Sequence, residues 1–192
     1  MHAALLFLLL LGAPFWETRQ PRQWSDEELQ EMLTDSPWAQ TTTFRDAAPV
    51  VVYLAGAKPL LDAGAERQRR YSKTDTAPAA TPASEYGIFL AQNKDKVIVL
   101  AIGNPNVTAL SEEAEVKRME EESVLKLGRK KVRMIGHFPP TPSDPVLRLV
   151  YPRPSEAVKD LDFELYIPGV TGPYRQAIFR WKDLAYQGKI EM

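Results

Sequence analysis

The chain has 192 residues, of which 44% are hydrophobic and 26% charged, so it can bury one ordinary core and is not disordered throughout. Its 24 lysines and arginines balance 25 aspartates and glutamates, which argues against nucleic acid as a partner because such binding needs a basic excess. The absence of cysteine excludes disulfides, thiolate nucleophiles, iron–sulfur clusters and cysteine zinc sites, and we expect no cofactor.

An uncharged apolar run covers residues 3–15. A membrane span needs about 20 apolar residues, so this run suits the central part of a secretory signal peptide better than a transmembrane helix. No lysine or arginine precedes the run and Pro14 makes a poor cleavage site, so a buried apolar helix at the N-terminus is the alternative. We predict a signal peptide over residues 1–14 and a single α+β domain over residues 15–192. The mature chain is expected to contain no transmembrane segment and to be secreted or periplasmic.

The clearest local signature is a helix start at Ser25. Ser25 as the N-cap and Glu28 three residues later form a capping box, which satisfies two backbone amide donors. Trp24 and Leu29 occupy the two positions of a hydrophobic staple, and Pro37 marks the end of the segment. The pattern predicts a short helix that lies on the core.

The next part of the chain is predicted to alternate between strands and helices. Residues 49–55 are β-branched and predict a buried strand, and residues 59–70 predict a helix with a proline in its first turn. Residues 72–84 are rich in alanine, proline and threonine and predict a flexible loop. Residues 86–90 and 96–102 predict a pair of strands.

Charged residues dominate the segment from 111 to 133. Residues 111–122 carry opposite charges at i,i+4 spacing, which is typical of a helix with a solvated face. The basic residues at 126–133 surround Gly128, which favours a turn with solvated charges. A phosphate-binding patch is the alternative, but no aromatic residue interleaves with the basic ones as a strand-binding groove requires.

The C-terminal half alternates like an antiparallel sheet. In residues 160–167, apolar side chains at the odd positions alternate with Asp, Asp, Glu and Tyr at the even positions, which is typical of a half-buried strand. Further strands are expected at 132–135, 146–151, 175–181 and 186–192. We therefore predict an α+β fold with a capped N-terminal helix, a strand–helix unit and a mainly antiparallel β-sheet or sandwich in the C-terminal half.

His137 is the one histidine that follows the predicted signal peptide, so it is the one imidazole available for catalysis. A hydrolase would need this imidazole beside a serine and a carboxylate, and the chain has no Gly-x-Ser-x-Gly motif to present the serine. A lone histidine is more often structural, so we expect no catalytic residue and keep His137 as the candidate for the hydrolase alternative.

Three carboxylates, those of Asp160, Asp162 and Glu164, project from one side of a predicted strand. Such a row could bind Ca²⁺, but residues on a strand diverge instead of converging on one point. We expect no metal site and keep these three residues as the candidates for a metal-binding alternative.

Trp16, Trp24 and Trp38 lie close together in the sequence. Exposed tryptophans can form a surface for a ligand or a protein partner. The alternative is that they attach the N-terminal arm to the core.

The two ends of the chain carry motifs that resemble a family of uncharacterised exported bacterial proteins, some of them labelled GWxTD-domain-containing. The matching residues are Phe15-Trp16-Glu17, Trp24-Ser25, Glu28, 33–39, Tyr151-Pro152-Arg153 and 179–191, with looser similarity over 52–63 and 123–131. The resemblance covers about half of the chain and implies a signal peptide and a bacterial, exported setting. It supplies no catalytic residues.

Together these features predict a non-catalytic binding or structural module of the bacterial envelope or exterior. Its partner is expected to be a protein or another envelope component. The alternatives are a hydrolase that uses His137 and a carboxylate metal-binding domain.

Overall fold

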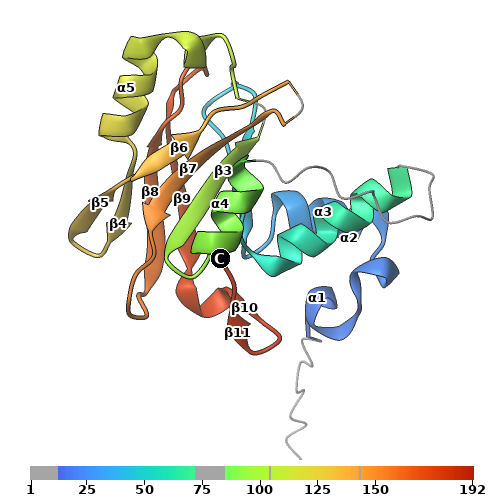
Figure 1. Cartoon of the computed structure of the whole chain (residues 1–192). Coiled ribbons are helices and arrows are strands. Elements are labelled where there is room, and N and C mark those ends of the chain that lie inside the picture. Colours follow the sequence, from blue (N-terminus) through green and yellow to red (C-terminus); the bar gives the residue numbers. More distant parts are fainter. Residues whose placement is uncertain (1–12, 72–84, 104, 143) are drawn as a thin grey trace, which may run out of the picture.

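The computed structural model describes residues 13–71, 85–103, 105–142 and 144–192 (Figure 1). Most of the predicted signal peptide and the whole predicted loop at 72–84 lie outside the described residues. The described part is α+β, as expected: two antiparallel sheets pack face to face, and helices cover the far side of one of them (Figure 1). Within these ranges, no helix combines the length and apolar character that a bilayer crossing requires.

The larger sheet, sheet A, has the strand order β1-β2-β3-β7-β6, and sheet B has the order β5-β4-β8-β9. Sheet A consists of β1 (Ala39–Thr42), β2 (Val50–Leu54), β3 (Val97–Gly103), β7 (Val146–Pro152) and β6 (Gly136–Phe138). Sheet B consists of β5 (Lys130–Arg133), β4 (Val124–Leu127), β8 (Asp160–Tyr166) and β9 (Tyr174–Arg180). A small hairpin of β10 (Ala185–Tyr186) and β11 (Lys189–Ile190) follows.

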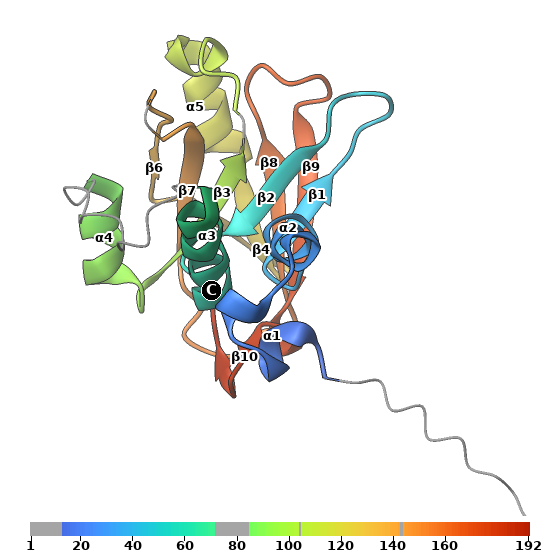
Figure 2. The ribbon, with the colours of Figure 1, turned by 90° about the vertical axis from the view of Figure 1, so that its right-hand side faces the viewer.

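The helices lie mostly on the side of sheet A that faces away from sheet B. Figure 2 looks onto this layer and shows α2, α3 and α4 across the sheet. The α-helices are α1 (Phe15–Thr18), α2 (Asp26–Thr34), α3 (Lys58–Tyr71), α4 (Glu85–Asn93) and α5 (Glu113–Glu122). Short 3₁₀ turns form η1 (Pro21–Gln23), η2 (Ala109–Ser111) and η3 (Trp181–Asp183).

The main core lies between the two sheets. Alternate residues of β3, among them Ile98 and Leu100, meet alternate residues of β8, among them Phe163. The rings of Tyr151 on β7 and Phe163 on β8 have centroids 5.2 Å apart, which places the two sheets in direct contact. The mainly antiparallel sheets predicted for the C-terminal half are therefore confirmed, and they pack as a sandwich whose larger sheet also includes β1, β2 and β3.

The N-terminal helix forms as predicted. The Ser25 hydroxyl accepts from the Glu28 amide at 3.1 Å, and the Glu28 carboxylate accepts from the Ser25 amide at 2.8 Å. Trp24 and Leu29 are both buried in the main core, as the staple positions require.

The predicted strand at 86–90 is wrong, because this segment is the helix α4. Tyr86, Phe89 and Leu90 stand at i, i+3 and i+4 and all pack against the outer face of sheet A, together with Phe138. A short apolar run fits a strand or a helix equally well from its sequence. The position beside β3 is occupied by β2 and β7, so the run covers the sheet instead of joining it.

The strand expected at 132–135 begins earlier, as β5, and pairs with β4, a strand that the sequence did not predict. Gly128 takes a φ of +61° between them, so the predicted turn is confirmed. A second glycine-containing turn joins β8 to β9, with φ values of +71° at Gly169 and +62° at Gly172.

Candidate functional site

His137 lies on the edge strand β6 and is partly buried. Its Nδ1 is 3.2 Å from Oε1 of Glu120, whose side chain is half-exposed. Among the described residues no hydrogen bond joins a serine to this imidazole, so the arrangement that a serine hydrolase needs is not assembled there.

Asp160, Asp162 and Glu164 lie along the outer face of sheet B, as their alternation predicted. The Lys126 ammonium lies 3.1 Å from Glu164 Oε1 and 3.4 Å from Asp162 Oδ2. Hydrogen bonding to Lys126 lowers the pKa of Glu164 from its ordinary value. In the part of the chain that the structure describes, these carboxylates are not gathered into a metal-binding group.

The three tryptophans do not form an exposed surface. Trp24 is 2% exposed and Trp38 is fully buried. The Trp38 indole donates to the Glu191 carbonyl at 3.0 Å, and the half-buried ring of Trp16 lies 6.0 Å from that of Trp38. These contacts join the N-terminal arm to the C-terminal hairpin, which is the anchoring alternative.

A different site lies on the outer face of sheet A, where the side chains of the central strand become small. The outward residues of β3 are Val97, Val99, Ala101 and Gly103 in that order. The two valines and the alanine are buried in a cluster with side chains of α4. A groove of about 700 Å³, a size typical of small-molecule sites, has Gly103 at the end of this row in its lining.

The strand register determines which side chains flank the small residues Ala101 and Gly103. Ala101 pairs with Tyr53 of β2 on one side and with Arg148 of β7 on the other. Gly103 pairs with Val146 of β7 in the next row. The register therefore places the Tyr53 phenol and the Arg148 guanidinium on either side of Ala101.

Three helices form the walls of the groove. Leu33 of α2 and Leu60 and Leu61 of α3 supply apolar side chains on one side, and Tyr86 of α4 stands on the other. Leu61 is 51% exposed, so it contributes accessible apolar surface to this lining.

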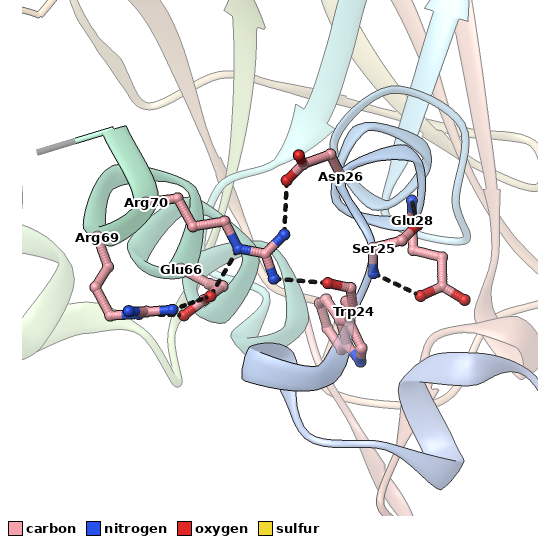
Figure 3. A network of polar contacts seen from close by, with 7 residues as sticks. All are labelled: Trp24, Ser25, Asp26, Glu28, Glu66, Arg69 and Arg70. Atoms are coloured by element: carbon pink, nitrogen blue, oxygen red, sulfur yellow. Dashed lines mark hydrogen bonds and ion pairs between the residues drawn. The ribbon is translucent and has the colours of Figure 1, made fainter. Parts of the chain in front are cut away.

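A polar network fixes α3 against α2 beside the groove (Figure 3). The buried carboxylate of Glu66 binds Arg69 and Arg70, with N–O distances of 2.7 and 2.8 Å. Arg70 also binds Asp26 and donates to the carbonyl of Trp24, both at 2.6 Å. The Arg69 and Arg70 guanidiniums lower the pKa of Glu66 to about 2. These hydrogen bonds and ion pairs therefore hold α3 against α2.

Two residues of the lining, Tyr86 of α4 and Arg148 of β7, are not fully partnered. The Tyr86 hydroxyl and Arg148 Nε are buried and have no hydrogen-bond partner among the described residues. The two Arg148 Nη atoms bind the Asp144 carboxylate at 2.8 and 3.0 Å, and the guanidinium lies over the Tyr86 ring, 4.1 Å from its centroid. Burial raises the pKa of Tyr86 to about 12, although the Arg148 guanidinium acts in the opposite direction through its charge and through its proximity to the hydroxyl. Both groups are therefore donors at neutral pH.

The chemistry of the lining suits binding. Its polar side chains are arginines, tyrosines, glutamines and a threonine. Among the described residues that line it there is no aspartate, glutamate, histidine, lysine or serine, and the residues present are mainly hydrogen-bonding and apolar groups.

Sequence reasoning missed this groove, although two signals point to it. Outward positions of β3 shrink from Val99 to Ala101 to Gly103 while the inward positions stay large, which indicates a hollow on one face. Arg148 is the one charged residue in the otherwise apolar strand β7. A single charge on a covered sheet face is a candidate binding group.

Comparison with known proteins gives no match: no family model, no curated protein and no solved structure matches this chain.

Proposed function

We propose that this chain is an exported, non-catalytic binding module of the bacterial envelope or exterior, and that the groove on the outer face of sheet A is its binding site. The observation that carries the proposal is the pair of buried donors in the groove lining, Tyr86 Oη and Arg148 Nε, which lack partners among the described residues. A buried donor without an acceptor costs about 1–3 kcal/mol, and a bound ligand that supplies the acceptor recovers that cost.

The non-catalytic part of the proposal is supported by the lining of the groove and by the surroundings of His137. The lining lacks the usual acid–base side chains among its described residues, and the His137 imidazole has a half-exposed glutamate as its neighbour instead of a serine. The exported part is supported by the apolar run at residues 3–15 and by the resemblance to exported bacterial proteins.

Native mass spectrometry tests the proposal on the full chain isolated gently from the envelope fraction of the native organism. The expected result is a bound species on the unaltered protein. Gly103→Leu is expected to remove it, because a Cβ at this position meets only Val51 at ordinary contact distances of 3.8 and 3.9 Å and the larger side chain fills the groove floor. The protein should retain its fold, which circular dichroism checks.

Gly136→Ala is the matched control. Gly136 lies on the same sheet at its edge and does not line the groove, and a Cβ added there would meet no described atom within 4 Å. The bound species should persist in this variant. A bound species that survives Gly103→Leu, or a protein found only in the cytoplasmic fraction, contradicts the proposal.

A further inference from the structure

We infer that the occupant of the groove is a small amphipathic carboxylate, with its anionic end at Tyr86 and Arg148 and its apolar body against the leucines of α2 and α3. The inference rests on the proposed function, since it names the ligand class of the same site.

The charge of the groove favours an anion. Arg148 and Arg67 both line it, and no acidic residue does among the described ones. Asp144, which does not line the groove, pairs with the two Nη atoms of Arg148, and its carboxylate is 40% exposed to solvent. Arg67 is exposed and makes no ion pair with any described residue. Two guanidiniums and one carboxylate leave a net positive charge at the groove, which disfavours a cationic ligand.

The free donors favour an oxygen acceptor. Arg148 Nε and the Tyr86 hydroxyl belong to side chains in direct contact, so two oxygens of one planar group are suited to accept from both. Hydrogen bonds from a guanidinium to a carboxylate are about twice as strong as those between neutral groups, which favours a carboxylate over an alcohol or an amide.

The walls favour an apolar body. Leu33, Leu60, Leu61, Val51 and Val146 line the groove beyond the two donors, and Leu61 is half-exposed. A hydrocarbon tail that covers these side chains removes apolar surface from water on both partners. The phenol of Tyr53, whose pKa is raised by burial, stands on the floor beside them.

Isothermal titration of the purified full-length chain tests the inference with two carboxylates, decanoate and 4-phenylbutyrate. Each is paired with its neutral counterpart, 1-decanol or 4-phenyl-1-butanol, and decyltrimethylammonium is the cationic probe. We expect at least one carboxylate to bind about tenfold more tightly than its alcohol, and the ammonium probe to bind most weakly.

Three variants place the binding in the groove. Gly103→Leu should weaken binding of the carboxylate about tenfold or more, and Gly136→Ala should leave it unchanged. Arg67→Gln, at an exposed position without an ion pair to any described residue, should reduce the preference for carboxylate over alcohol without changing thermal stability.

Two results overturn the inference: no binding of either carboxylate, or binding of the alcohols as tight as that of the carboxylates. Carboxylate binding that Gly103→Leu does not weaken also overturns it, because the site would lie elsewhere. If native mass spectrometry finds a groove-bound species that is not a carboxylate, this inference fails while the proposed function stands.

Discussion

The outer faces of the two sheets differ in how their polar groups are partnered. On sheet B, Asp160, Asp162 and Glu164 lie beside lysines, and Asp162 also accepts from the Gln176 amide at 2.8 Å. On sheet A, Tyr86 and Arg148 each keep a buried polar atom without a partner among the described residues.

The difference shows that a conspicuous row of charges is a poor guide to a site. The carboxylates of sheet B attract attention in the sequence, yet a lysine lies beside each of them, so these three groups are partnered without a ligand. The groups on sheet A are fewer and less conspicuous, and they lie in a hollow where water is largely replaced by protein. A buried polar group without a hydrogen-bond partner in the lining of a groove is the better indication of a binding site.

The largest expected effect comes from removing one member of a complete buried network. Glu66→Gln should lower the free energy of unfolding by about 2–3 kcal/mol, because Glu66 is 5% exposed and two arginines lose their carboxylate. Urea unfolding measures the loss. Asp62→Asn on the same helix removes an exposed pair with Lys58 and should cost less than about 0.5 kcal/mol. Equal losses in both variants would contradict the distinction between buried and exposed pairs.

The same carboxyl group predicts how stability depends on pH. Hydrogen bonds from Arg69 and then Arg70 lower the pKa of Glu66 from 4.5 to about 2, so its stabilising contribution is present above about pH 5 and is lost as the pH falls from there toward 2. Urea unfolding across this range should show a steeper loss for the unaltered protein than for Glu66→Gln. Parallel curves would show that Glu66 is not the titrating group.

An intermediate effect on stability is expected at the groove on the outer face of sheet A. Tyr86→Phe should raise the free energy of unfolding by about 1 kcal/mol, because it removes a buried hydroxyl without a partner, and should weaken decanoate binding about tenfold. Tyr151→Phe is the matched control, since its buried hydroxyl also lacks a partner but lies in the core between the sheets. It should raise stability similarly and leave binding unchanged. A loss of stability in Tyr86→Phe would mean that the hydroxyl is already satisfied in the free protein.

The smallest effect is expected on sheet B. Lys126→Met should change the urea midpoint very little at low salt and still less at high salt, because the ion pairs of Lys126 with Asp162 and Glu164 are solvated. Millimolar Ca²⁺ should leave the melting temperature of the unaltered protein unchanged. A clear rise with Ca²⁺ would restore the metal-binding alternative for Asp160, Asp162 and Glu164.

Local signals explain which parts of the fold could be predicted. The helix start at Ser25 depends on residues within one turn, and the strand at 160–166 depends on its own alternation, so both were predictable. The helix α4 was not, because its type depends on where β2 and β7 leave room beside β3. The same holds for the groove: Tyr53 and Arg148 are far apart in the sequence, and only the register of β2, β3 and β7 brings them into one row.

The tryptophans show that sequence proximity does not predict exposure to solvent. Trp24 and Trp38 share one sequence neighbourhood, but exposure depends on what covers them, and the C-terminal hairpin with Glu191 does so from the other end of the chain. Sequence proximity indicated a cluster correctly and could not decide between docking and anchoring.

The most direct test of the account is the proton NMR signal of the Arg148 Nε–H group during a titration with decanoate. The account predicts a downfield shift as this donor acquires a carboxylate acceptor. Arg175 gives an internal reference in the same spectrum, because its Nε is also buried without a partner among the described residues but its guanidinium lies against Phe44 and the Thr171 carbonyl, away from the groove. A shift of Arg148 alone supports the groove as a carboxylate site. An Arg148 signal that does not move at saturating decanoate, or that moves only together with Arg175, would contradict it.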